Sequence, residues 1–143
     1  MNQTVIRSVA VTTADVVAAL ETNETTSKQA VLRVLPPFNG RMRARLHLVS
    51  DRAADSDRPE EALYLDPETL APGAPAYPRP SETAAELRAN PEEPYSVERH
   101  HEYHAEAVAQ WRKAVAEQIT ETVTVESSTG DHEIRVRPLY KEF

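Results

Sequence analysis

Two kinds of apolar pattern run through the first fifty residues: alternating runs typical of strands, and one stripe with helical spacing. The run from Val5 to Val11 predicts a short strand. A helix is expected to follow from near Ala14, because Thr12 or Thr13 can cap it with a side-chain oxygen. Asn23 is the expected stop of this helix, since asparagine tolerates the left-handed conformation that ends many helices.

Residues 30–35 and 41–49 predict two further strands. The intervening residues 36–40 read Pro-Pro-Phe-Asn-Gly. Proline lacks the donor that a strand ladder needs, and Asn-Gly accepts positive φ, so these residues predict a turn. We therefore expect the two strands to pair antiparallel with each other as a hairpin.

The middle of the chain has a different composition. Residues 51–96 hold eight of the eleven prolines together with eleven acidic side chains, which predicts an acidic Pro-rich connecting segment at about 51–95. Within this segment, residues 62–65 predict a short edge strand. Ser81 is expected to cap a short helix over residues 82–90.

The last third of the chain predicts the longest helix and a second hairpin. Ser96 is expected to cap a helix that runs from Val97 to about Thr122. Seven residues at three- and four-residue steps define one face of this helix: Val97, His101, His104, Val108, Trp111, Val115 and Ile119. Residues 122–126 and 132–136 then predict a terminal hairpin.

This order of elements predicts an α+β fold. We expect a small antiparallel sheet of hairpins, with the long C-terminal-half helix and the short N-terminal helix packed on one face. A chain of 143 residues suits a single domain spanning residues 1–143. No run approaches the roughly 20 apolar residues that span a bilayer, and no basic-then-apolar segment opens the chain. A cytoplasmic protein without a membrane partner is therefore expected.

Charge is unevenly distributed along an acidic chain. The net charge is −7, from 23 acidic and 16 basic side chains, and 13 of the basic side chains are arginine. Residues 1–50 nevertheless carry six basic and only three acidic side chains. The basic surplus therefore belongs to the first fifty residues. The absence of cysteine excludes disulfides and thiolate chemistry.

The most specific feature of that region is a basic stripe. Basic residues alternate with apolar residues along 41–48, and alternate residues of a strand share a face. The anion-binding candidates are Arg33, Arg41, Arg43, Arg45 and His47. The intervening residues from Met42 to Leu48 are expected to be buried. Guanidinium groups match phosphate and carboxylate oxygens, so we expect nucleic acid or an acidic protein as partner. The alternative is internal pairing with Glu98, Glu102 and Glu106 of the long helix.

A second candidate lies in the segment His100-His101-Glu102-Tyr103-His104. His100 and His104 are four residues apart on one helix face, the spacing that paired metal ligands use. Two histidines do not complete a ligand set, so no metal site is assigned to them. The alternative is that His101 and His104, which lie on the apolar face of the helix, bond to neighbours at the edge of the core.

The common catalytic motifs are missing from the sequence. Glycine totals three without forming a phosphate loop, and no Gly-x-Ser-x-Gly elbow is present. Ser127, Ser128 and Thr129 precede Asp131 and His132, but turn residues alone explain this run. We predict no catalytic residue and no cofactor, and a non-enzymatic role is favoured.

Two stretches resemble small uncharacterised proteins of haloarchaea. The first spans Thr13 to Val49 and includes the helix residues 15–20, the strand residues 30–34 and the run 36–47. The second spans Tyr95 to Arg112. Many carboxylates with only three lysines are also typical of proteins that work in molar salt, where screening is strong. The resemblance implies a halophilic cytoplasm and a single domain, but it carries no activity and no site residue.

Three functions therefore remain open. The leading hypothesis is a non-enzymatic binding or adaptor domain that uses the basic strand face against an anionic partner. One alternative is a metal-binding protein or metal-dependent enzyme centred on His100 and His104. The other is a structural subunit of a larger complex, in which the long helix forms a homo-oligomer.

Overall fold

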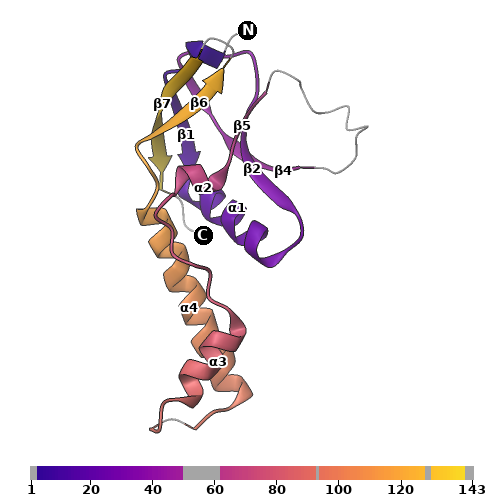
Figure 1. The fold of residues 1–143 in the computed structure, drawn as a ribbon, viewed down its shortest axis with the longest axis vertical. Helices are drawn as coiled ribbons and strands as arrows, with labels where there is room; N and C mark the ends of the chain where they lie inside the picture. Colours follow the sequence, from indigo (N-terminus) through magenta and orange to yellow (C-terminus); the bar gives the residue numbers. More distant parts are fainter. Residues whose placement is uncertain (1–2, 50–61, 93, 128–129, 141–143) are drawn as a thin grey trace.

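The computed structural model describes residues 3–49, 62–92, 94–127 and 130–140 (Figure 1). The elements in chain order are the 3-10 turn η1 (Gln3–Val5), β1 (Ser8–Thr12), α1 (Thr13–Thr25), β2 (Gln29–Val34), β3 (Arg41–Arg43), β4 (Arg45–Val49), β5 (Leu63–Leu65), α2 (Pro67–Leu70), α3 (Pro80–Arg88), α4 (Val97–Glu117), β6 (Thr122–Ser127) and β7 (Gly130–Leu139). Small sheets, one long helix and several shorter helices confirm the predicted α+β class. The first part of the predicted acidic segment, residues 51–61, lies outside the described residues.

The strands form two sheets, with the orders β3-β1-β7-β6 and β4-β2-β5. β1 pairs parallel with both β3 and β7, whereas the terminal hairpin of β6 and β7 is antiparallel, as predicted. The three-stranded sheet is antiparallel throughout. The prediction of an antiparallel arrangement therefore fails at β1, because the first and last strands of the chain run side by side in the same direction.

The predicted hairpin of residues 30–35 and 41–49 forms only in its second half. β2 pairs with β4, while β3 belongs to the other sheet. The chain crosses between the sheets at Ala44, whose N–H donates to the carbonyl of Ala10 at 3.0 Å. Ala44 is fully buried at this crossing, which a larger side chain would obstruct.

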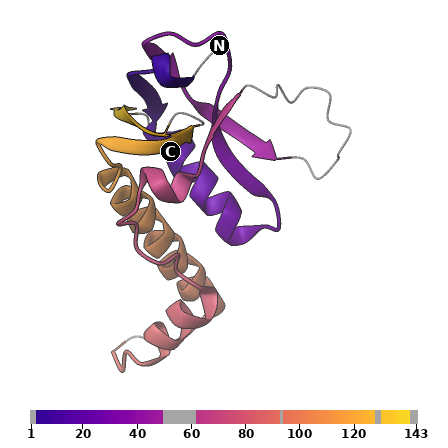
Figure 2. The same cartoon turned by 45° about the horizontal axis from the view of Figure 1, so that its top comes forward.

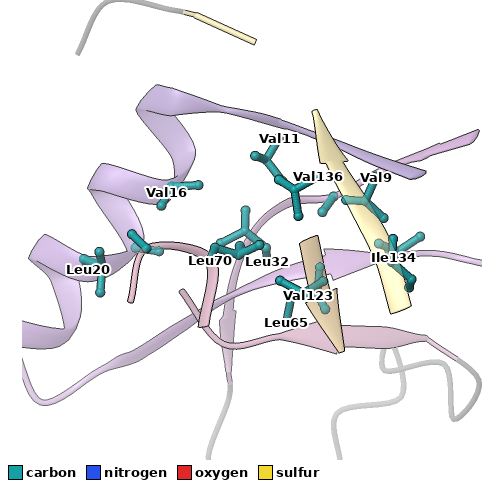
Figure 3. Close-up of a cluster of buried hydrophobic side chains, with 14 of the residues drawn as sticks. Val9, Val11, Val16, Leu20, Leu32, Leu65, Leu70, Val123, Ile134 and Val136 are labelled. Carbon is teal, nitrogen blue, oxygen red and sulfur yellow. The ribbon is translucent and has the colours of Figure 1, made fainter. Parts of the chain in front are cut away.

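Apolar side chains from both sheets and from α1 meet in one core (Figure 3). The labelled core residues are Val9, Val11, Val16, Leu20, Leu32, Leu65, Leu70, Val123, Ile134 and Val136. Each of these side chains contributes roughly 1.5–3 kcal/mol by leaving water. Burial of one face of β7 explains why Ile134 and Val136 alternate with exposed residues there, whereas β1 and β2 are buried over most of their length on both faces.

Helix α1 begins as the sequence predicts but ends later. The Thr12 side chain accepts a hydrogen bond from the backbone N–H of Asp15 at 3.1 Å, which caps the helix. The helix continues to Thr25, beyond the predicted stop at Asn23. Instead, the Asn23 side-chain oxygen accepts a hydrogen bond from the Ala30 N–H at 2.6 Å, and the Asn23 side-chain nitrogen donates to the Ala30 carbonyl at 3.1 Å. Asn23 therefore anchors the start of β2 rather than ending the helix.

The two other predicted caps have different outcomes. Ser96 caps α4, because its hydroxyl oxygen accepts from the N–H of Arg99 at 3.1 Å. Ser81 does not cap α3, which begins at Pro80. Proline suits the first position of a helix because its missing N–H would have no partner there. The cap position of α3 is Arg79, and it makes no side-chain cap bond.

Helices α3 and α4 form an arm that projects away from the two sheets (Figures 1 and 2). Val108, Trp111 and Val115 in the second half of α4 are buried. Val97 at the start of the helix is 76% exposed. The predicted apolar face of the long helix is therefore buried only toward its C-terminal end, which comes at Glu117.

The Pro-rich residues 71–80 are held between the body and the arm. The Trp111 indole N–H donates to the carbonyl of Pro75 at 2.9 Å. The ring of Tyr77 meets Trp111 edge-on, with ring centroids 4.8 Å apart. This connection is therefore fixed in place by aromatic side chains, and it determines where α3 begins.

Candidate anion-binding face

The predicted basic stripe is divided between the two sheets. Arg41 and Arg43 lie on β3, at the edge of the four-stranded sheet. Arg45 and His47 lie on β4, at the edge of the three-stranded sheet. Alternation places residues on a common face only within one strand, and the crossing at Ala44 interrupts it. The structure therefore does not bring the five candidates together.

Three of the candidates share the three-stranded sheet. Arg33 lies opposite Arg45 in the register of β2 and β4, and Val31 lies opposite His47. The rings of His47 and Tyr64 are 6.0 Å apart. Like charges directly opposite each other on a sheet are unfavourable. This half of the stripe is therefore a separate basic patch, on a different sheet from Arg41 and Arg43.

The apolar side of the stripe also departs from expectation on β4. Leu46 and Leu48 remain 38% and 47% exposed, although they were expected to be buried. Their register partners on β2 are fully buried. The difference follows from the edge position of β4, which leaves its core-facing side chains at the margin of the core. Met42 and Ala44 do pack inward as expected.

The four-stranded sheet gathers arginines from opposite ends of the chain. Strand β1 lies between β3 and β7, and residues in register across parallel strands share a face. The residues of the outer face, row by row across the sheet, are Arg41, Ser8 and Arg135, then Arg43, Ala10 and Arg137. We call these four arginines the arginine face. All four are exposed, while the residues between them form a floor of small side chains.

Burial of the opposite sheet face makes these arginines point outward. Val9 and Val136 are buried and Met42 packs against the core, so their neighbours in the same strands face solvent. The β3 and β7 arginines are separated by two strand spacings, about 10 Å. Successive arginines within one strand are about 7 Å apart. Glu133 continues the same face of β7 toward the tip of the hairpin.

One end of the arginine face is hollowed into a pocket of about 580 Å³. Its lining consists of Val5, Arg7, Ser8, Gly40, Arg41, Arg135 and Arg137, and we call it the arginine pocket. The backbone N–H groups of Arg7 and Ser8 both donate to the carbonyl of Gly40 at 2.9 Å, which fixes the turn at this end. The lining residues include four arginines and no acidic residue.

Arg112 provides a contrast with the arginine face, because it is paired with a carboxylate. Arg112 donates to Glu21 at 2.9 and 3.0 Å, and this hydrogen bond raises the pKa of Arg112. Within the described ranges, no carboxylate forms an ion pair with an arginine of the arginine face. Glu98, Glu102 and Glu106, the alternative partners predicted for the basic stripe, lie instead on the projecting arm.

His100 and His104 come together around a threonine. The Thr83 hydroxyl oxygen lies 2.9 Å from His100 Nε2 and 3.0 Å from His104 Nδ1, and the hydroxyl donates to the carbonyl of Pro80 at 3.1 Å. Thr83 is buried, so this cluster ties α3 to α4. Among the residues that the structure describes, no three His, Asp or Glu side chains gather to hold a metal ion. The histidine pair therefore forms part of the contact between α3 and α4.

Sequence reasoning missed Arg7, Ser8, Arg135 and Arg137. A signal for two of them exists, because Arg135-Val136-Arg137 repeats the pattern of Arg41-Met42-Arg43. The alternation predicts an exposed basic face in each strand, but it does not say which strands are neighbours. Parallel pairing of β1 with both β3 and β7 brings the two patterns together.

Fold and site together define a small α+β domain that presents an arginine-rich sheet face. The chain belongs to the family described as a domain of unknown function, DUF8009, whose model matches residues 1–140. The comparisons with curated proteins and with solved structures gave no match. In the described part of the chain, no helix has the length and apolar character to cross a membrane.

Proposed function

We propose that this chain is a non-enzymatic binding or adaptor domain of a halophilic cytoplasm, and that it binds an anionic partner on its arginine face. The observation that carries the proposal is the register of β3, β1 and β7, which aligns four exposed arginines on one sheet face. Nucleic acid and acidic protein are the partner classes that the basic strands favour. The proposed contact surface is therefore the arginine face, in place of the five anion-binding candidates taken from the sequence.

Arginine suits such a surface for a physical reason. Its planar guanidinium donates two parallel hydrogen bonds to one phosphate or carboxylate, which adds geometric specificity to charge attraction. A hydrogen bond to a charged group contributes about 1.5–3 kcal/mol. The four side chains are exposed, so they contribute little to the stability of the fold itself. Their arrangement is better explained by binding than by folding.

A high-salt interior would favour this type of contact. The excess of carboxylates and the three lysines support a halophilic origin. At molar salt the screening length falls to about 3 Å, so long-range attraction between charges is lost. Direct bidentate contacts act within that distance and keep part of their strength. Binding by closely placed arginines is therefore compatible with such a cell, although its affinity falls as salt rises.

A pair of matched double variants tests the proposal. Arg135→Gln with Arg137→Gln removes half of the arginine face, and Arg33→Gln with Arg45→Gln removes two positive charges from the other sheet. Fluorescence anisotropy would measure binding to labelled RNA, duplex DNA and poly-glutamate at several potassium chloride concentrations.

The first variant should weaken binding at least about tenfold, because two charge-assisted contacts are lost. The second variant should bind nearly as well as the wild-type chain. Equal losses in both variants would show that net charge alone matters, and the absence of binding to any polyanion would remove the proposal.

A further inference from the structure

The arginine pocket is lined by arginine on both sides of the central strand β1. The following inference about its ligand rests on the proposed function of the surrounding face. One wall is Arg41 on β3, and the other is Arg135 and Arg137 on β7. The walls are about 10 Å apart because a single strand separates them. Arginine side chains from both walls can therefore contact one group that lies between them, whereas a wide ligand would touch only their tips.

The floor of the pocket adds a neutral donor. Ser8 lies on the central strand, between the two walls, and is only 8% exposed. In the described part of the chain, its hydroxyl has no hydrogen-bond partner. A hydroxyl at this position can donate to an anion held by the flanking arginines. The lining contains neither an aromatic ring nor a carboxylate.

Charge density distinguishes the ligands that this pocket would hold. Four arginines line the pocket, and the two of them on β7 are two residues apart, about 7 Å along the strand. Over that length an extended peptide contributes about two residues and so about two carboxylates. One strand of nucleic acid contributes about two phosphates. A terminal phosphate alone carries about −1.5 to −2 charges, so a short chain of phosphates comes closest to neutralising the site.

We propose that the arginine pocket binds a linear polyphosphate, either inorganic polyphosphate or the 5′-triphosphate of a nucleotide. The phosphate oxygens accept hydrogen bonds from the arginines of both walls and from Ser8 on the floor. Because no aromatic ring lines the pocket, a nucleotide base adds little to the affinity. Because no carboxylate lines it, Mg²⁺ has no protein ligand there and competes with the arginines for the phosphate oxygens.

Isothermal titration calorimetry on the full chain, in buffer with a metal chelator, tests the ligand. Orthophosphate, pyrophosphate, tripolyphosphate and adenosine triphosphate are titrated separately. Affinity should rise with the number of phosphates, and tripolyphosphate and the nucleotide should bind within a few fold of each other. Addition of Mg²⁺ should weaken binding of both.

Single substitutions locate the site. Arg41→Gln and Arg135→Gln, one from each wall, should each reduce tripolyphosphate affinity about tenfold. Arg45→Gln is the matched control, because it removes the same charge from β4 and should leave the affinity nearly unchanged. Thermal melts of each variant confirm that the fold is retained.

Each contrary outcome has a distinct meaning. If RNA or poly-glutamate binds in an Arg135-dependent manner while tripolyphosphate does not, the polyphosphate assignment fails and the proposed function stands. If none of these anions binds, both fail. If Arg45→Gln costs as much as Arg135→Gln, the assignment to this pocket is wrong.

Discussion

At the residue scale, one carboxylate joins three parts of the chain. The Glu21 side chain accepts from Arg112 Nε at 3.0 Å, from Arg112 Nη2 at 2.9 Å and from the Tyr77 hydroxyl at 3.0 Å. Glu21 therefore connects α1 to α4 and to the Pro-rich connection. The Arg112 side chain is 36% exposed, so solvent screens its charge, and the value of the network lies in its fixed geometry.

Tyr77 makes the stability of the protein sensitive to alkaline pH. Burial raises the pKa of Tyr77 above its usual value of about 10, and the hydrogen bond to Glu21 raises it further. A raised pKa in the folded state means that this stabilisation is complete below about pH 10 and is lost as pH rises through the folded pKa.

Urea denaturation of the Tyr77→Phe variant should therefore show a loss of about 1 kcal/mol near neutral pH. The difference from wild type should shrink as pH rises above about 10. Tyr140→Phe is the control, because Tyr140 is 80% exposed and its substitution should change nothing. A difference that is constant across this pH range would contradict the assigned role of Tyr77.

At the element scale, helix α4 lies in two environments. Its second half packs on the body through Trp111 and Val115, whereas its first half contacts mainly α3. Thr83 and the two histidines hold the helices of the arm together at one point. The start of α4 therefore depends more on its own cap than the start of α1 does.

The threonine cap of α1 and the serine cap of α4 should respond differently to substitution. Thr12→Ala removes a cap at the buried junction of β1 and α1 and should lower the global free energy of unfolding by about 1 kcal/mol. Ser96→Ala should mainly increase fraying of the first turn of α4, because this end of the helix is exposed. Urea denaturation measures the first effect, and amide hydrogen exchange measures the second. Equal global losses would show that the arm is as tightly coupled to the core as α1.

The sequence predicts elements better than it predicts their neighbours. The caps at Thr12 and Ser96 and the strand at residues 62–65 are local features, and local patterns are enough to find them. The crossing at Ala44 depends on which sheet provides a hydrogen-bond partner for its backbone. The alternation of basic and apolar residues continues unchanged through Ala44, so the sequence gives no sign of the crossing. For the same reason the basic stripe includes two members of the proposed site, Arg41 and Arg43, and misses the two that come from β7.

At the scale of the whole molecule, the arginine face combines parts of the chain that are far apart in the sequence. The chain carries a net charge of −7, yet its four-stranded sheet exposes an arginine face assembled from the first and last thirds of the sequence. Strands β1 and β7 are adjacent, so both ends of the described chain are needed to build the face (Figure 1). Removal of either strand should abolish the site, not merely weaken it.

The acidic remainder predicts dependence on salt. Carboxylates that repel one another in dilute buffer are screened at molar salt, where the screening length is about 3 Å. The thermal midpoint should therefore be several degrees higher in molar potassium chloride than in dilute buffer. Melts followed by circular dichroism in the two buffers measure this difference. An equal or higher midpoint in dilute buffer would refute the halophilic origin that the composition suggests.

The central claim is that anions bind on the outer face of the four-stranded sheet, and NMR on the isotope-labelled full chain tests it most directly. Titration with tripolyphosphate, and separately with a short RNA, should shift the backbone amides of Ser8 and Ala10 and the guanidinium signals of Arg41 and Arg135. Arg45 on the other sheet and the residues of the arm should shift little. Shifts centred on Arg45 or on the arm, or no shifts with either anion, would contradict the claim.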